Sequence, residues 1–155
     1  MTSWLKMGCA GVQALPEPGY CPKESIAGME KILGWAPSVS GALFITIDVT
    51  QPQPPGNEIT PDFYGVFKDG PVTGELERAR DRAPLGTTLT GHLWTHGDRL
   101  YGRYLWAHVP GKGKIPICLE LGDFGDVGIT KMDGSKPGAI IAPKQVPAFA
   151  TREWR

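Results

Sequence analysis

Apolar and polar positions alternate along residues 86–121, the stretch GTTLTGHLWTHGDRLYGRYLWAHVPGKGKIPICLEL. Three alternating segments are separated by Gly97-Asp98 and by the tetrapeptide PGKG. A period of two is typical of half-buried β-strands, and short glycine-bearing loops between such runs favour antiparallel hairpins. The pattern therefore predicts a three-stranded β-meander.

A two-residue turn at Gly97-Asp98 gives the register of the first hairpin. It pairs Trp94 with Tyr101, His92 with Arg103, Thr90 with Leu105, Gly91 with Tyr104 and Leu89 with Trp106. With PGKG as a four-residue loop, Tyr104 meets Leu119, Trp106 meets Ile117 and Arg103 meets Glu120. Both hairpins then agree on one inner face: Leu89, Gly91, Leu93, Gly102, Tyr104, Trp106, Ile117, Leu119 and Leu121. The outer face carries His92, Trp94, Tyr101, Arg103, Leu105, Cys118 and Glu120.

The inner-face glycines indicate curvature. Gly102 faces Leu93 and Gly91 faces Tyr104, so each glycine leaves room for a large side chain. Glycine at such positions permits the bend by which a small sheet closes on itself. Further strands are expected at 42–50 and 62–70, and the tail 144–155 should end as a closing strand.

One helix is expected near the N-terminus, at residues 21–34. Pro22 suits a first helical turn, and Ile26, Met29 and Leu33 form one apolar stripe. Gly34 is a natural stop, whereas Gly28 weakens the helix, which should therefore depend on packing. The predicted fold class is mainly β: a small bent antiparallel sheet or barrel with one N-terminal helix packed on it.

The remaining segments suggest one domain behind a tether. Residues 1–20 lack periodicity and read as an N-terminal tether, and 21–155 as a single β-rich domain. The proline-rich stretch 51–61 and the segment 122–128 are expected to be loops. The charged run 75–83 is interpreted as a solvated turn or loop.

Composition narrows the function classes. Lysine plus arginine and aspartate plus glutamate are both 16, so the formal charge is +0 and the pI about 6.8. This balance argues against nucleic-acid binding driven by bulk charge. A hydrophobic content of 41% is that of a globular chain, and no apolar run approaches the length of a membrane-spanning helix.

The three histidines raise the question of a metal or catalytic site. His92 and His96 share the outer face of one strand about 13 Å apart by strand rise, too far to bind one metal ion together. The register puts His108 on the inner face near Ile115. The sequence contains no CxxC, GxSxG, P-loop or GxGxxG motif. We therefore predict no catalytic residues, no metal and no cofactor.

An aromatic and basic patch on the outer face is the best candidate for binding. It consists of His92, Trp94, Tyr101 and Arg103, and such residues dominate protein-interaction hot spots. A protein partner is the expected ligand, and a glycan is also possible. The structural alternative is that the helix packs there, because Leu105 and Cys118 need cover; the end near Trp94 and Tyr101 would then stay open.

The N-terminus leaves two interpretations open. Gly8-Cys9-Ala10-Gly11 resembles the point after which a bacterial lipoprotein begins, so Cys9 is a lipidation candidate and the only route to a membrane. Only eight residues precede it, too few for a secretory signal peptide. Either the true start lies upstream and the protein is in the cell envelope, or the chain is cytoplasmic.

A family resemblance bears on this choice. The segments CPKESIAGMEKILG, KDGPVTG and 84–121 resemble a small domain of myxobacterial proteins that are often labelled Ser/Thr kinases because the domain also adjoins kinase domains. Some members are free-standing envelope lipoproteins, and the family implies no established activity. The glycine-rich loop and HRD signature of kinases are missing here. The proline-rich loop and short N-terminus depart from the family.

The resemblance, together with the position of Cys118 beneath the helix, implies a Cys21–Cys118 disulfide, which suits an exported protein. The alternative is that Cys118 is a small buried apolar residue and Cys21 merely precedes a proline. Our leading interpretation is a non-enzymatic, envelope-associated interaction module. A structural subunit of a larger assembly comes second, and a hydrolase with a histidine-based site third.

Overall fold

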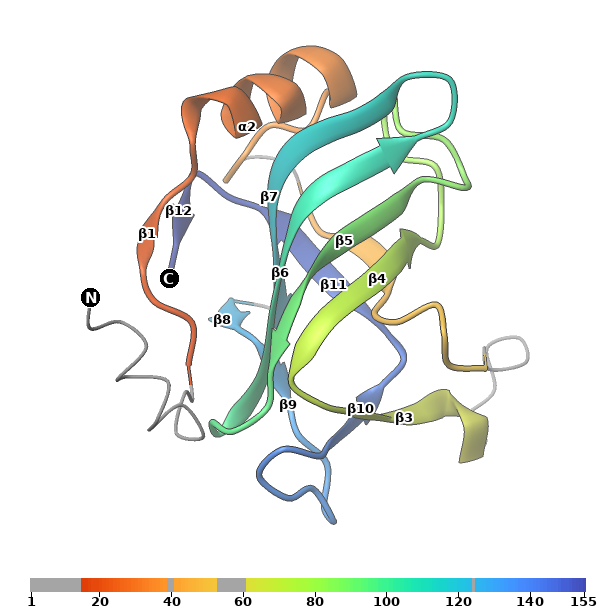
Figure 1. The fold of residues 1–155 in the computed structure, drawn as a ribbon, viewed down its shortest axis with the longest axis vertical. Coiled ribbons are helices and arrows are strands. Elements are labelled where there is room, and N and C mark those ends of the chain that lie inside the picture. The colour runs from red at the N-terminus through yellow and green to blue at the C-terminus, as the bar shows by residue number, and fades with distance from the viewer. Residues whose placement is uncertain (1–14, 39–40, 53–60, 124) are drawn as a thin grey trace, which may run out of the picture.

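Six antiparallel strands close into a barrel in the computed structural model, which describes residues 15–38, 41–52, 61–123 and 125–155 (Figure 1). The order around the barrel is β7 (Gly113–Asp123), β11 (Gln145–Ala150), β2 (Leu43–Thr46), β4 (Gly70–Leu76), β5 (Thr88–Trp94) and β6 (Arg99–Val109), and β6 pairs back with β7. This confirms the predicted mainly β fold with one helix. The expected closing strand in the tail is β11, which joins β7 to β2.

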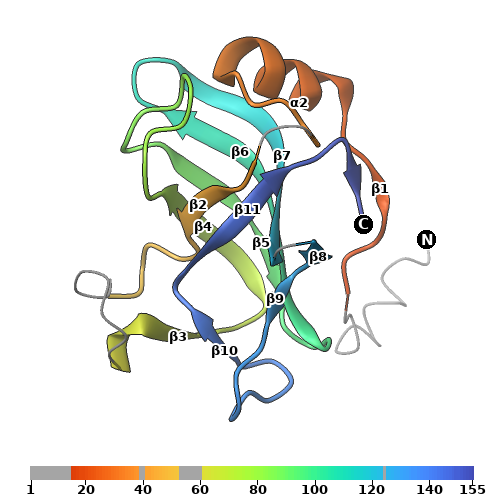
Figure 2. The same cartoon turned by 180° about the vertical axis from the view of Figure 1, so that it is seen from behind.

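Short strands extend the barrel at one end and lie along its outside (Figure 2). β3 (Tyr64–Phe67) follows a 3-10 turn, η3 (Pro61–Phe63), and pairs with β10 (Ile140–Pro143). β8 (Asp126–Val127) pairs with the end of β7, so the segment 122–128, expected to be a loop, contains a strand pair. β9 (Ile129–Thr130) follows it and pairs with β6. β1 (Gly19–Tyr20) pairs with β12 (Glu153–Trp154), which brings two segments far apart in the sequence together.

The N-terminal helix packs on the outer surface of β7 (Figure 1). It is α-helical over α2 (Lys23–Ala27) and π-helical over η2 (Gly28–Leu33), and it ends at Gly34, whose φ is +81°. Met29 and Leu33 are fully buried, as the stripe predicts. Gly28 has a role that the sequence did not suggest: a Cβ there would lie 2.5 Å from the carbonyl oxygen of Pro116. The bare glycine lets the helix approach the strand.

Apolar side chains fill the barrel interior. Leu89, Leu93, Ile117, Leu119 and Leu121 of the predicted inner face are all buried. Tyr104 is also fully buried, and its hydroxyl donates a hydrogen bond of 2.8 Å to the carbonyl of Ile47.

The inner glycines permit close packing, against side chains at Gly102 and against the backbone of β6 at Gly91. A Cβ on Gly102 would meet Leu121 and Leu93 at 2.7 and 2.9 Å, and one on Gly91 would lie 1.9 Å from the carbonyl oxygen of Arg103. The structural interpretation of these glycines is therefore confirmed.

A β-bulge at Leu105 divides the meander into a part that the register predicts and a part that it does not. Trp94–Tyr101, His92–Arg103, Gly91–Tyr104, Tyr104–Leu119 and Arg103–Glu120 pair as expected. Beyond the bulge the pairing shifts by one residue.

The shift corrects three predicted pairings and the faces predicted for two residues. Thr90 pairs with Trp106 rather than Leu105, Leu89 with Ala107 rather than Trp106, and Trp106 with Pro116 rather than Ile117. Trp106 is 37% exposed, so its place on the inner face was wrong, and the buried Ala107 takes it. His108 was also placed on the wrong face. It lies only partly buried on the outside, where its Nε2 is 3.3 Å from the hydroxyl of Thr90.

Cys21 and Cys118 form the predicted disulfide, with Cα atoms 6.1 Å apart. The bond ties the start of the helix to β7. It also lies against the C-terminal segment, because the N–H of Cys21 donates to Arg152 and the N–H of Thr151 donates to the carbonyl of Cys118. The helix does not cover Leu105, which is 46% exposed, so that part of the expected packing was wrong.

The charged run 75–83 leaves the barrel after Leu76 and forms an irregular turn. Its arginines bind backbone carbonyls: Arg82 donates to Lys31 and Ile32 in the last turn of η2. Cations at a helix C-terminus satisfy free carbonyls there.

The N-terminal part of the chain is described only from Leu15 onward. Cys9 lies outside the described residues, as do residues 53–60 of the proline-rich stretch. The division into tether and domain at residue 20 stays a prediction, although Gly19 and Tyr20 already pair with β12. None of the described helices is long and apolar enough to cross a membrane.

Candidate functional site

The predicted patch lies on the outer face of β5 and β6. The rings of His92 and Trp94 are 4.7 Å apart, and the Arg103 guanidinium lies 5.7 Å from the Trp94 ring. Tyr101 pairs with Trp94 across the strands, but its hydroxyl donates to Asp98 and its ring lies against Gly128. Tyr101 is therefore engaged in holding its own turn.

Arg103 is covered by the C-terminal strand and not by the helix. Its guanidinium lies 4.7 Å from the ring of Trp154, which is itself buried. The Nε atom of Arg103 is 3.7 Å from a carboxylate oxygen of Glu120, and both side chains are about nine-tenths buried. Within the described residues, Nε and Nη2 of Arg103 have no hydrogen-bond partner.

The low-polarity surroundings shift both members of this pair. Burial lowers the pKa of Arg103, which the Glu120 charge opposes. Burial raises the pKa of Glu120, which Arg103 and the backbone N–H of Arg155 oppose. The pair is thus a charged centre on the outer surface of the barrel, closed over by Trp154.

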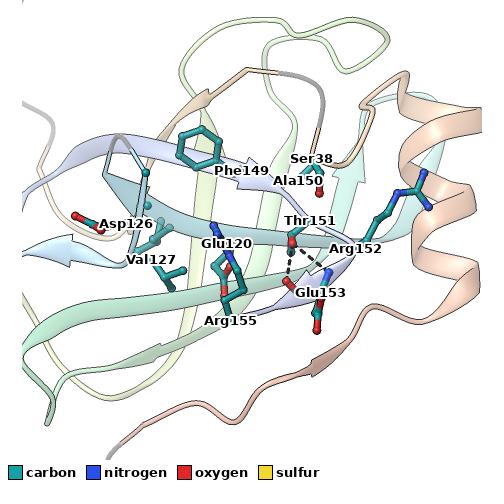
Figure 3. Close-up of a pocket in the computed structure, with 13 residues that line it drawn as sticks. Ser38, Glu120, Asp126, Val127, Phe149, Ala150, Thr151, Arg152, Glu153 and Arg155 are labelled. Atoms are coloured by element: carbon teal, nitrogen blue, oxygen red, sulfur yellow. Dashed lines mark hydrogen bonds between the residues drawn. The ribbon is translucent and has the colours of Figure 1, made fainter.

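A cavity of about 560 Å³ opens beside this charged centre (Figure 3). It lies between the end of β7, β8, β11 and the C-terminal segment, and Glu120 is part of its lining. The lining residues are Ser38, Glu120, Leu121, Gly122, Gly125, Asp126, Val127, Phe149, Ala150, Thr151, Arg152, Glu153 and Arg155. We call this the C-terminal cavity. It brings together carboxylates, guanidinium groups, hydroxyls and one aromatic ring.

A second candidate surface is the part of the barrel's outside that no described element covers. Among the described elements, none lies over the outer face of β4, β5 and the adjoining half of β6 in Figure 1. We call this surface the bare wall. Leu105 and Trp106 project from it, 46% and 37% exposed, and the ammonium of Lys114 lies 4.1 Å from the Trp106 ring. His92 and Trp94 continue the same surface toward the far end of β5.

The three histidines do not converge on one site. His92 contacts Trp94, His108 contacts Thr90, and Nδ1 of His96 lies 3.3 Å from a carboxylate oxygen of Asp69. Nε2 of His96 lies beside Gly138, which has no side chain to act together with the imidazole. Among the described residues, no group of three or more His, Cys, Asp and Glu is arranged to hold a metal ion.

Asp69 lies just before β4, at the edge of the bare wall, and is held by hydrogen bonds. The backbone N–H and the hydroxyl of Thr95 both donate to it at 2.5 Å. Burial raises the pKa of Asp69, but these two hydrogen bonds and the neighbouring His96 outweigh it and hold that pKa below its ordinary value.

Sequence reasoning missed the residues that the C-terminal segment brings to the site. Trp154, Glu153 and Arg155 have no periodicity around them, and only the pairing of two distant segments places them. It also overlooked that residues 123–125 spell DFG, the letters of a kinase motif. Asp123 here accepts hydrogen bonds from Arg99 and Thr130 and ties a hairpin to β6, so its role is structural.

Comparison with protein-family models gives no match, and no curated protein is similar in sequence to this chain. The myxobacterial resemblance therefore stays an expectation.

Proposed function

We propose that this chain is a non-enzymatic interaction module of the cell envelope that binds a protein partner through the bare wall. The observation that carries the proposal is the exposed ridge of Leu105 and Trp106, which His92 and Trp94 continue. Neither the helix nor the β1–β12 pair covers this ridge. Large exposed side chains that adjoin one another are typical of interaction sites.

The composition of the ridge favours a protein. Tryptophan is enriched at the centres of protein interfaces, where it is desolvated on binding. The basic side chain of Lys114 stands over Trp106, and His108 lies on the same outer surface. These groups favour a partner surface that is apolar at its centre and acidic at its rim.

The disulfide supports the envelope as the compartment, because such bonds form and persist in oxidising surroundings and are rare in the cytosol. Lipidation of Cys9 belongs to the same proposal. Mass spectrometry of the N-terminal peptide from membrane fractions tests it, with Cys9→Ser as the control. A membrane-bound Cys9→Ser protein would count against a lipid at this position.

The docking surface is tested by photo-crosslinking in cells. A photoreactive residue at Leu105 should give a defined adduct with one other protein, and the same residue at Val66, which is 51% exposed on β3, should not. Equal adducts at both positions would contradict the proposal. An adduct with a second copy of this chain would favour the alternative of a structural subunit in a larger assembly.

A further inference from the structure

The C-terminal cavity is separate from the bare wall, and its chemistry points to a different ligand. Its volume of about 560 Å³ is within the usual range of small-ligand pockets, about 300–1,000 Å³. The lining comes from the end of β7, from β8, from β11 and from the C-terminal segment, so the cavity exists only when the barrel is closed and its tail is docked.

Two apolar side chains contribute to the lining of the cavity. The ring of Phe149 leans over Gly122, where a Cβ would lie 3.1 Å from its Cδ2 atom. Val127 adds a second apolar side chain. Phe149 is only partly buried, so its ring is available to a ligand as a flat apolar surface.

The rest of the lining is polar and carries both signs of charge. Glu120 is buried and already receives the Arg155 backbone N–H, whereas Asp126 and Glu153 are exposed, and no ion pair joins either to another described residue. Arg152 is held by an ion pair with Glu30, and the exposed Arg155 is the other cation of the lining. Hydroxyls of Ser38 and Thr151 complete the set.

This arrangement disfavours ligands with a strong net charge. An anion would meet Glu120, Asp126 and Glu153, and a multivalent cation would meet Arg155 and Arg152. A hydroxyl group both donates and accepts, so one hydroxyl can bind a carboxylate and the next a guanidinium. Hydrogen bonds to charged side chains are also the stronger kind.

We propose that the C-terminal cavity binds a neutral saccharide, whose apolar ring face packs on Phe149 and whose hydroxyls bind Asp126, Glu153 and Arg155. The site does not depend on the protein partner of the bare wall. Glu120 is the buried acid of the lining, and its carboxylate lies 3.7 Å from the Nε atom of Arg103.

The test is an NMR titration of the oxidised protein with chitohexaose and with cellohexaose, alongside hexalysine and hexa-aspartate as charged probes. At least one saccharide should shift the amides of Gly122, Asp126 and Thr151 saturably. Phe149→Leu and Asp126→Asn should each weaken that binding about tenfold or more, a change of about 1.4 kcal/mol. Phe44→Leu is the matched control, because Phe44 is exposed on β2 outside the cavity.

Three results would overturn the proposal: no saturable shift with either saccharide, shifts that the two cavity variants leave unchanged, or tighter binding of a charged probe at the same amides. Retained thermal unfolding and an intact disulfide in both variants exclude misfolding as the cause of lost binding. The crosslinking experiment at Leu105 does not depend on the cavity, so a failure of the saccharide proposal leaves the proposal for the bare wall intact.

Discussion

The outer surface of the barrel has two sides that differ in whether other parts of the chain cover their outward residues. On β7 the outward residues Cys118 and Glu120 are 0% and 5% exposed, because the helix and the C-terminal segment with β12 cover them. On β6 the outward residues Leu105 and Trp106 remain open to solvent. Cys118 and Glu120 follow the alternation of β7, whereas the bulge turns two consecutive residues of β6 outward. Facing outward therefore does not by itself determine whether a residue is buried.

The two sides differ in the contacts that they make with a covering element. Gly28 and Cys21 on the helix side match Pro116 and Cys118 on β7, one by close contact and the other by a covalent bond. Leu105 and Trp106 have no such match among the described residues of this chain. We therefore expect substitutions on the covered side to affect stability and substitutions on the bare wall to affect binding.

The largest effect should come from breaking the covalent contact. Cys21→Ser removes a bond between residues 97 apart in sequence, and the chain-entropy relation gives a loss of about 4–5 kcal/mol in the free energy of unfolding. Urea titration of the oxidised protein measures it. The reduced wild type is the control and should unfold near the variant. A loss below about 1 kcal/mol would mean that the bond adds little to the covered side.

A smaller loss should follow from filling the close contact between helix and strand. Gly28→Ala places a methyl group 2.5 Å from the Pro116 carbonyl, and overpacking of this kind costs about 1–3 kcal/mol. Alanine favours a helix by about 1 kcal/mol, which opposes part of that cost. Gly41→Ala is the control, since no atom lies within 4 Å of its Cβ position. A stabilised Gly28→Ala protein would contradict the observed approach.

At the edge of the bare wall, Asp69 should give a pH-dependent effect. Its pKa is lowered on folding, so the ionised form contributes stability that is present above the ordinary pKa of 3.8 and is lost as the pH falls through the folded pKa. Asp69→Asn should flatten this acid slope. Thermal unfolding between neutral and acidic pH measures it, and Thr95→Val, which removes one donor, should flatten it in part. Equal slopes in all three proteins would refute the assignment.

The smallest effect is expected on the ridge itself. Leu105→Ala should change the free energy of unfolding by less than about 0.5 kcal/mol, because the side chain is half exposed. Met29→Ala on the covered side should cost about 2–5 kcal/mol, because Met29 is fully buried. Denaturant titrations of the two variants sharpen the comparison directly. Similar losses would show that Leu105 is packed and the wall is not bare.

The sequence predicted the parts of this fold that depend on local alternation. The turn at Gly97-Asp98 placed Trp94, His92 and Gly91 opposite their actual partners, and Gly34 marked the end of the helix. The alternation did not predict the bulge at Leu105, because strict alternation assigns Trp106 to the interior. The interior, already occupied by Tyr104, instead accepts the much smaller Ala107.

The site was predicted only in part for a similar reason. His92, Trp94 and Arg103 follow from one hairpin, so their proximity could be inferred. The cover on Arg103 comes from Trp154, in a strand of two residues that pairs with another strand of two residues near the opposite end of the chain. No periodic signal exists in so short an element, and only the assembled barrel brings the two segments together.

The position of β11 has a consequence for how the chain is made and folded. β2 is synthesised by residue 46, but one of its two neighbours in the barrel is β11, which begins at Gln145. Until then β2 and β7 each present an unpaired edge, and such edges invite pairing with other chains. Because most of the closing contacts join distant residues, we expect slow folding and a nascent chain that depends on protection from aggregation until the last strand is inserted.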